Sequence, residues 1–208
     1  QAVPIGLASA GTSGATAGKA AAEYARAAAA PAVDEEQVKR LRGEALAPLN
    51  RNSGVEPDQV LLSVQEAVVP YDVLLLRREN RMRKALEAVD DVRDNLLPLL
   101  RAYDPHYLRM AHEARNLTLI AELHLRMALA RTESRAVLRE DFPYEDNQNW
   151  LKWVIAERED GAIKLSTQDV PVESYPLKPE RTRNLHHMWQ LAEKLGIVKL
   201  EGGAVKWA

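Results

Sequence analysis

The 208-residue chain contains no cysteine and only one phenylalanine. Without cysteine it can form no disulfide, no thiolate metal site, no thiol nucleophile and no iron–sulfur ligation of its own. No apolar run is long enough to span a bilayer. The first residues also lack the basic flank and apolar centre of a signal peptide. Since the chain starts at Gln1 rather than at methionine, we expect a piece of a longer protein.

An excess of either charge is also missing. The 28 basic and 30 acidic residues are closely interleaved and give a formal net charge of −2. Nucleic acids and anionic membrane surfaces select strongly basic faces. The sequence therefore gives no reason to expect either partner.

Alanine is abundant near the start of the chain. Residues 15–30 are nearly all strong helix formers, and we expect a helix there. The flexible turn Gly11–Gly14 should precede it, and Pro31 should end it. This helix has no amphipathic stripe, so it should pack closely against other structure.

The middle of the chain is predicted to be helical almost throughout. Asp34 with the two following glutamates gives a charged first turn, and Pro70 and Asp104-Pro105 interrupt the pattern. Four helical segments are predicted, at residues 34–49, 56–69, 73–97 and 108–129. Long helices joined by short links favour a bundle.

The pattern changes after Arg131. Short runs on either side of Asp160-Gly161 predict a hairpin, and those around Gly202-Gly203 predict a second. Between them we expect a proline-marked extended coil and a last helix from Arg181 to Leu195. The predicted fold is mainly α, a bundle of three or more long helices with a small C-terminal α+β lobe containing one or two hairpins. The predicted divisions are 1–30, 31–135 and 136–208.

Two segments resemble a known family. The first contains Glu133-Ser134-Arg135, Arg139-Glu140-Asp141, Phe142-Pro143 and Asn149-Trp150-Leu151-Lys152, in that order. It resembles the block that closes the helical domain of the succinate dehydrogenase, fumarate reductase and adenylylsulfate reductase flavoproteins. Order and spacing match over about twenty residues. The resemblance implies that its charged residues form ion pairs that brace the helical domain against the FAD domain.

The second segment, residues 11–21, resembles the last loop and helix of the family's FAD domain, where a helix of small residues points its N-terminus at the flavin. The resemblance implies that Ser13, Gly14, Ala15 and Thr16 contact FAD. Unpaired N–H groups at a helix start carry partial positive charge, which favours the reduced flavin. Glycine and alanine allow close approach. The steric alternative is a helix that merely packs tightly against a sheet.

The resemblance implies a C-terminal domain of an FAD-dependent reductase or dehydrogenase, which closes the flavin site and supports subunit docking. FAD would be held mostly by FAD-binding and capping domains outside this chain, and an iron–sulfur subunit would be a further partner. We expect no catalytic residue, no metal ligand and no activity in this fragment alone. We also expect a cytoplasmic location, or one at the inner membrane face through partner subunits.

Two alternatives remain open: an adenylylsulfate reductase-like or other flavoprotein with a different acceptor, and a non-enzymatic helical interaction module. Departures from the family keep them open. Members that handle succinate or fumarate carry an arginine shortly before the small-residue loop, but Pro4–Ala10 contains none. The block usually continues with glycine and a nearby histidine, where this chain has Ala136 and Leu138.

The remaining charged residues favour structural roles. The basic stretch from Arg77 to Lys84 contains answering acidic residues and predicts a solvated helix face. The five histidines, at positions 106, 112, 124, 186 and 187, lack metal-ligand spacing. His186 and His187 are expected to cap the last helix or to lie on its surface.

Overall fold

The computed structural model describes residues 5–208 and divides the chain into two compact units, Gln1–Glu44 and Ala45–Ala208. The first unit contains α1 (Ile5–Ala27) and most of α2 (Glu35–Leu46). The first four residues of the predicted 1–30 segment lie outside the described residues. The divisions predicted at residues 30 and 135 stay predictions.

Helix α1 corrects one prediction. It runs through the Gly11–Gly14 segment without a break, so no helix begins at Ala15. The hydroxyls of Thr12, Ser13 and Thr16 donate to the carbonyls four residues earlier instead of capping a helix start. Such back-bonding satisfies the hydroxyls within a helix, and it lets the strong helix formers on both sides carry the helix across the glycines.

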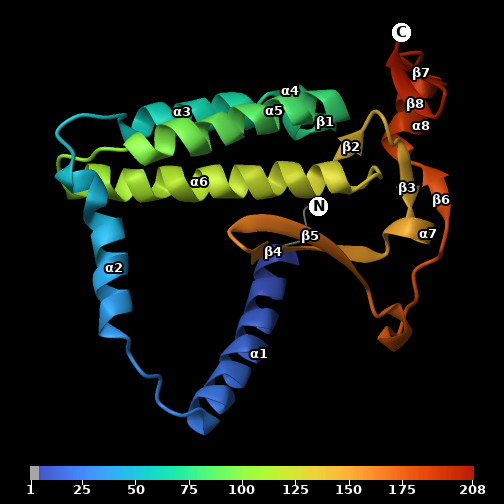
Figure 1. Cartoon of the computed structure of the whole chain (residues 1–208). Coiled ribbons are helices and arrows are strands. Elements are labelled where there is room, and N and C mark those ends of the chain that lie inside the picture. The colour runs from blue at the N-terminus through green and yellow to red at the C-terminus, as the bar shows by residue number, and fades with distance from the viewer. Residues whose placement is uncertain (1–4) are drawn as a thin grey trace. The chain divides into compact units, whose positions relative to one another are not determined.

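Three long helices form the bundle of the second unit: α3 (Pro57–Val68), α5 (Glu79–Asp91) and α6 (Pro105–Ala130). Successive long helices run in opposite directions (Figure 1). Prolines at the first helical positions of α3 and α6 start both helices, because the missing N–H would be unpaired there anyway. Asp104 caps α6 by accepting from the Tyr107 N–H at 2.9 Å.

Short elements connect the long helices. They are the 3₁₀ turns η1 (Ala47–Asn50) and η3 (Leu97–Leu99), helix α4 (Tyr71–Leu74), strand β1 (Leu76–Arg77) and the π-helical turn η2 (Val92–Leu96).

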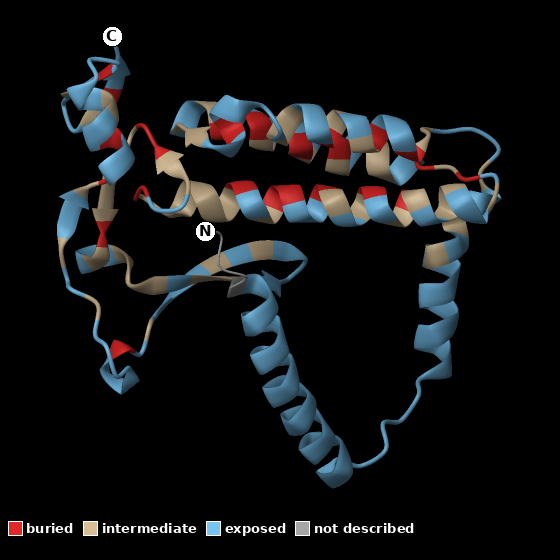
Figure 2. Ribbon diagram, turned by 180° about the vertical axis from the view of Figure 1, so that it is seen from behind, coloured by how far each residue is buried: buried red, intermediate tan, exposed pale blue. Residues whose placement is uncertain are grey.

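The bundle core lies on the facing stripes of the three helices. On α6 the buried positions 111, 114, 118, 121, 122 and 125 recur at helical spacing. They meet fully buried Val60 and Val64 of α3 and Met82 and Val89 of α5. Figure 2 shows this buried stripe along the bundle. The predicted bundle is confirmed.

The C-terminal lobe is built from strand pairs and two short helices. Strands β4 (Lys152–Glu159) and β5 (Ala162–Asp169) form one hairpin, and β7 (Val198–Glu201) and β8 (Ala204–Trp207) form the other. The remaining elements are β2 (Leu138–Arg139), β3 (Tyr144–Asp146), α7 (Asn147–Trp150), η4 (Val172–Ser174), β6 (Arg183–Leu185) and α8 (His187–Lys194). Both predicted hairpins are confirmed.

Two predicted helices are too long. Leu76–Arg77 leaves the helical run to pair, in parallel, with Leu138–Arg139. Arg183–Leu185 is not the start of the last helix but pairs antiparallel with Tyr144–Asp146. In both cases a partner distant in sequence offers the backbone a ladder that local propensity does not reveal. None of the described helices is long and apolar enough to cross a membrane.

Candidate functional site

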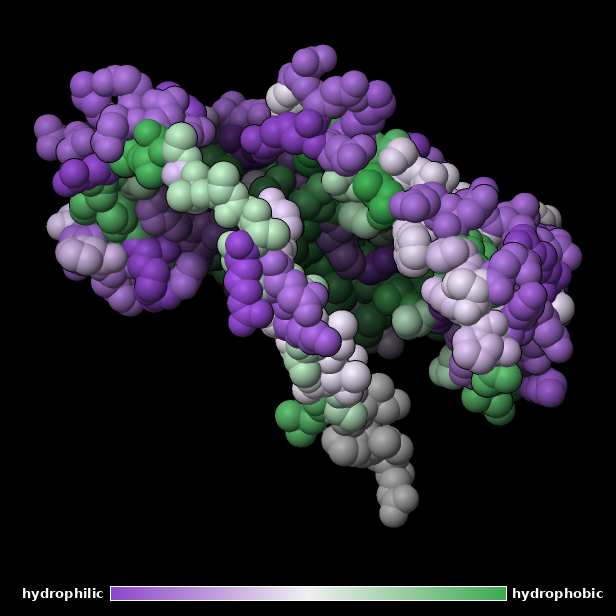
Figure 3. Space-filling view, turned by 90° about the horizontal axis from the view of Figure 1, so that it is seen from below, coloured by the Kyte–Doolittle hydropathy of each residue, from purple (hydrophilic) through white to green (hydrophobic). Residues whose placement is uncertain are grey.

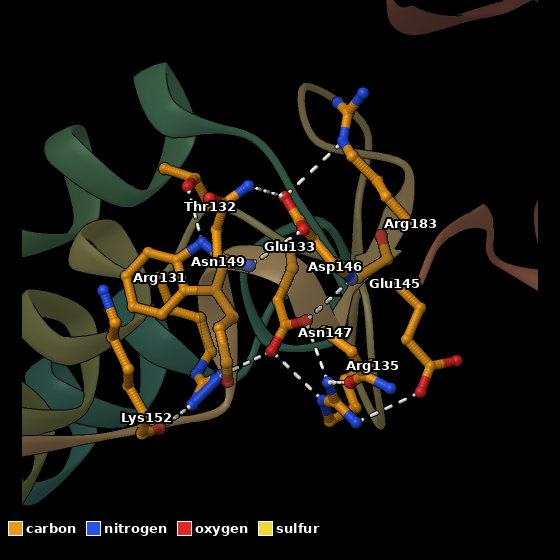
Figure 4. Close-up of polar contacts among 12 residues, drawn as sticks. Arg131, Thr132, Glu133, Arg135, Glu145, Asp146, Asn147, Asn149, Lys152 and Arg183 are labelled. Carbon is orange, nitrogen blue, oxygen red and sulfur yellow. Dashed lines mark hydrogen bonds and ion pairs between the residues drawn. The ribbon is translucent and has the colours of Figure 1, made fainter. Parts of the chain in front are cut away.

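Residues 131–150, here called the junction, connect the end of α6 to the first hairpin of the lobe. They include the Glu133-Ser134-Arg135 and Arg139-Glu140-Asp141 motifs of the sequence block. Figure 4 shows polar side chains of this segment converging on one another. Five polar residues of the junction, Glu133, Ser134, Arg139, Glu140 and Asp146, are buried.

Glu133 is the centre of the first group. Its side chain is completely buried, and its carboxylate forms ion pairs with Arg131 and Arg135. It also accepts a hydrogen bond from the backbone N–H of Asp146 at 3.1 Å. Arg131 stacks over the ring of Trp150, with its guanidinium carbon 5.0 Å from the ring centroid. A buried carboxylate with this many donors is held in one position.

Ser134 links the junction to the core of the lobe. Its fully buried hydroxyl accepts from the Arg139 backbone N–H at 2.8 Å and from the indole N–H of Trp189 at 3.2 Å. It donates toward the Phe142 carbonyl at 3.0 Å. Trp189, on α8, packs with Val198 and Val205 in the small core of the lobe. One hydroxyl therefore joins three segments, and its hydrogen-bonding capacity is used up.

Arg139 caps the C-terminal end of the long helix α6. Its guanidinium makes a two-pronged ion pair with Asp141, at 2.7 and 2.8 Å, and donates to the carbonyls of Ala128 and Arg131. Those carbonyls have no partner inside the helix, and a cation there also offsets the negative helix end. The guanidinium lies 4.9 Å from the centroid of Phe142. Burial alone would raise the pKa of Asp141, but the hydrogen bonds and charge of Arg139 hold it below its ordinary value.

Glu140 corrects the prediction of a solvated basic face. Its side chain is 2% exposed and pairs with Arg78 at 3.2 Å and Arg81 at 2.8 Å, and it accepts from the Trp207 indole at 3.1 Å. The two arginines belong to the bundle, whereas Trp207 belongs to the last hairpin. Only the outer part of the basic stretch is solvated as predicted, with Arg83 paired to the exposed Glu79. Sequence reasoning missed this pairing because more than fifty residues separate the partners.

These contacts confirm the predicted ion pairing within the block, and they also show what it holds together in this chain. The pairs tie α6 and the start of α5 to the lobe. Bracing against an FAD domain stays a prediction.

His186 caps α8, as predicted, by accepting from the Met188 N–H at 3.3 Å. Burial lowers the pKa of His186, and the charge of the neighbouring His187 lowers it further.

The predicted flavin-contact residues lie away from the junction in sequence and belong to the first unit. Ser13, Gly14, Ala15 and Thr16 are exposed residues in the middle of α1. They therefore do not offer the free N–H groups expected of a helix start. Among residues 5–208, no group of three or more histidine, aspartate or glutamate side chains could hold a metal ion.

Comparisons with solved structures and with protein families found proteins that this chain resembles. Similar folds include the Mycobacterium smegmatis Sdh1 complex in the apo form (TM-score 0.62) and a FrdA variant of E. coli quinol fumarate reductase (TM-score 0.63), each 24% identical. The chain aligns over 78% and 75% of its own length and spans only 28% of either relative. No curated protein sequence matches it.

A family model described as the fumarate reductase flavoprotein C-term matches residues 65–184. The match includes α5, α6, the junction and the first hairpin, and it covers more than half of the chain. This chain therefore belongs to the family of fumarate reductase flavoprotein C-terminal domains.

Proposed function

We propose that the chain acts as the C-terminal domain of an FAD-dependent dehydrogenase or reductase, where it closes the flavin site and supports docking of other domains or subunits. The proposal rests on the ion pairing of the buried charged groups in the junction. Its buried charged groups are all engaged in ion pairs, with one another or with arginines of neighbouring elements, which suits a rigid brace and leaves no free acid, base or nucleophile there.

The chain by itself does not fit FAD. Dinucleotides are held by a strand, a glycine-rich loop and a helix start that together bind the pyrophosphate. The sequence contains no such unit, and Ser13–Thr16 lies within a helix rather than at its start. We therefore infer that FAD-binding and capping domains outside this chain bind the cofactor.

Helix α1 offers the surface for that docking. Residues 6–27 are all exposed, and a Cβ at Gly11, Gly14 or Gly18 would meet no atom within 4 Å apart from its chain neighbours and the backbone of its own helix. These three glycines recur at spacings of three and four and so share one helix face. Figure 3 shows α1 as a largely pale surface, neither strongly hydrophilic nor strongly hydrophobic. Small side chains there would let a neighbouring domain, or the flavin that it holds, approach the helix backbone closely.

The first experiment measures FAD retention through gel filtration. The 208-residue chain alone should retain no stoichiometric flavin, whereas its assembly with FAD-binding and capping domains should. Flavin bound stoichiometrically by the chain alone would contradict the proposal. An assembly that never forms would favour the helical interaction module.

The second experiment tests the glycine face with a matched control. Gly14→Val should lower flavin content or shift the flavin potential in the assembled flavoprotein. Gly43→Val, on α2, introduces the same helix penalty in equally open space and should leave both unchanged. Equal behaviour of the two variants would show that this face of α1 does not meet the flavin domain.

A further inference from the structure

A pocket of about 530 Å³ lies beside the junction, and several residues of the ion-pair network form part of its wall. It lies between the end of α6, the β1–β2 pair and the start of β4. Apolar groups, among them Met127, Val137, Trp153 and Val154, line much of it. This volume and lining are within the range of pockets that hold small organic molecules.

The charges around the pocket do not balance. Five cationic side chains line it, but Glu133 is the only carboxylate among the lining residues. Glu133 is already paired with two arginines, and Arg139 is paired with Asp141. Within the described part of the chain, Arg77 and Lys152 have no carboxylate at ion-pair distance. Two cations at this pocket are thus left without an anion.

Arg77 is held in place by the backbone. It lies directly across the parallel β1–β2 pair from Arg139, and its carbonyl accepts from the Glu140 N–H at 2.9 Å. Its side chain donates to the Leu74 carbonyl at 3.2 Å and lies 2.7 Å from Nε2 of His124. Since arginine can only donate, Nε2 accepts and the imidazole is neutral, with its proton on Nδ1.

The positive charges of Arg77 and Arg139 favour binding of an anion beside them. Like charges directly opposite each other on paired strands repel. Burial, together with the charge of Arg139, lowers the pKa of Arg77. Burial, together with the charge of Arg77, lowers the pKa of His124. A bound anion would offset the repulsion between Arg77 and Arg139 and the effect of the Arg77 charge on His124.

We propose that this pocket binds a small organic carboxylate with an apolar body, anchored by the guanidinium of Arg77. The planar donor fork of arginine matches a carboxylate, and the wall around Trp153 accepts the apolar part. This site goes beyond the docking function and does not depend on it, because every residue involved belongs to the second unit of this chain.

Benzoate is the probe, with acetate and benzyl alcohol as matched controls. Titration of the 208-residue chain is followed by NMR at the Trp153 indole and the His124 ring. Benzoate should give saturable shifts at both, acetate should bind more weakly because it lacks the ring, and benzyl alcohol should not saturate. The pKa of His124 should also rise when benzoate is bound. Shifts that never saturate, or equal binding of the neutral alcohol, would overturn the proposal.

Variants then locate the anchor. Arg77→Met should weaken benzoate binding roughly tenfold or more, because a charge-assisted hydrogen bond is lost. Arg158→Met, an exposed arginine outside the pocket on β4, is the matched control and should change nothing. If Arg77→Met fails to fold, Arg77→Lys keeps the charge without the fork and should weaken binding by a smaller factor. Benzoate affinity that is unchanged in every folded Arg77 variant would show that Arg77 is not the anchor.

Discussion

The core of the helical bundle and the junction are both buried, but they are stabilised by different interactions. Apart from Thr118 and Glu122 of α6, the buried side chains of the bundle are apolar, and the fully buried ones include Val60, Val64 and Met82. The junction buries Glu133, Arg139 and Glu140 and pairs them with arginines, an aspartate, the Trp207 indole and backbone groups. Apolar packing needs shape, whereas buried charges need specific partners.

This difference predicts how each region fails. A truncated apolar side chain leaves a cavity that neighbours can partly fill. A deleted arginine leaves a carboxylate or a carbonyl in the interior without its donor. The junction should therefore tolerate single substitutions less well than the bundle, except where its charges reach solvent.

The largest effect is expected for Arg139→Met. The change keeps the apolar stem but removes the donors to Asp141 and to two carbonyls at the end of α6. Breaking a buried pair in this way costs about 3–5 kcal/mol. The free energy of unfolding, from urea denaturation of the 208-residue chain, checks this. A loss below about 1 kcal/mol, the range of exposed pairs, would mean that the junction stabilises no more than a surface network.

Leu125→Ala is the corresponding change in the bundle. Leu125 is 1% exposed and belongs to the bundle core, so truncation should cost about 2–5 kcal/mol, depending on how far the cavity collapses. Leu119→Ala, at a position 40% exposed on the same helix, is the control and should cost about 0.5 kcal/mol or less. Equal losses in the two urea measurements would contradict the assigned core.

Acid should weaken the junction through Asp141. The pKa of Asp141 is lower in the folded protein than in the unfolded chain, so its stabilisation is complete above a pH of about 4. That stabilisation is lost as the pH falls further, through the lower folded-state pKa. Urea midpoints at pH 5 and pH 3 measure the loss, which should be smaller in Asp141→Asn. An equal loss in that variant would assign the acid sensitivity to other carboxylates.

The smallest effect is expected for Arg135→Met. The Arg135 side chain is 43% exposed, so water screens its ion pairs with Glu133 and Glu145. Glu133 also keeps Arg131 and the Asp146 N–H as partners. The cost should be about 1 kcal/mol or less. A loss as large as that of Arg139→Met would mean that exposure does not set the strength of these pairs.

Local sequence was sufficient to predict most of the elements. Helical spacing of apolar residues located the bundle, and Asp104-Pro105, predicted only as an interruption, is the start of α6. Asp160-Gly161 and Gly202-Gly203 marked both hairpin turns, since these residues adopt the positive φ angles found there. These features depend on neighbours a few residues apart, which a sequence shows directly. The resemblance of the Glu133–Asp141 block to the flavoprotein family likewise rests on contiguous residues.

The helix start predicted from the glycines and hydroxyls at residues 11–14 failed for a local reason, because the flanking helix formers carry α1 through them. Other features were decided by tertiary structure. Leu76–Arg77 and Arg183–Leu185 have helix-compatible sequences and become strands because distant partners complete their hydrogen bonds. The sequence by itself determined the helices, the turns and the family, because these depend on local propensity and motif order. Only the folded chain placed Arg78 and Arg81 on Glu140, and Arg77 against His124, because those contacts join residues far apart in sequence.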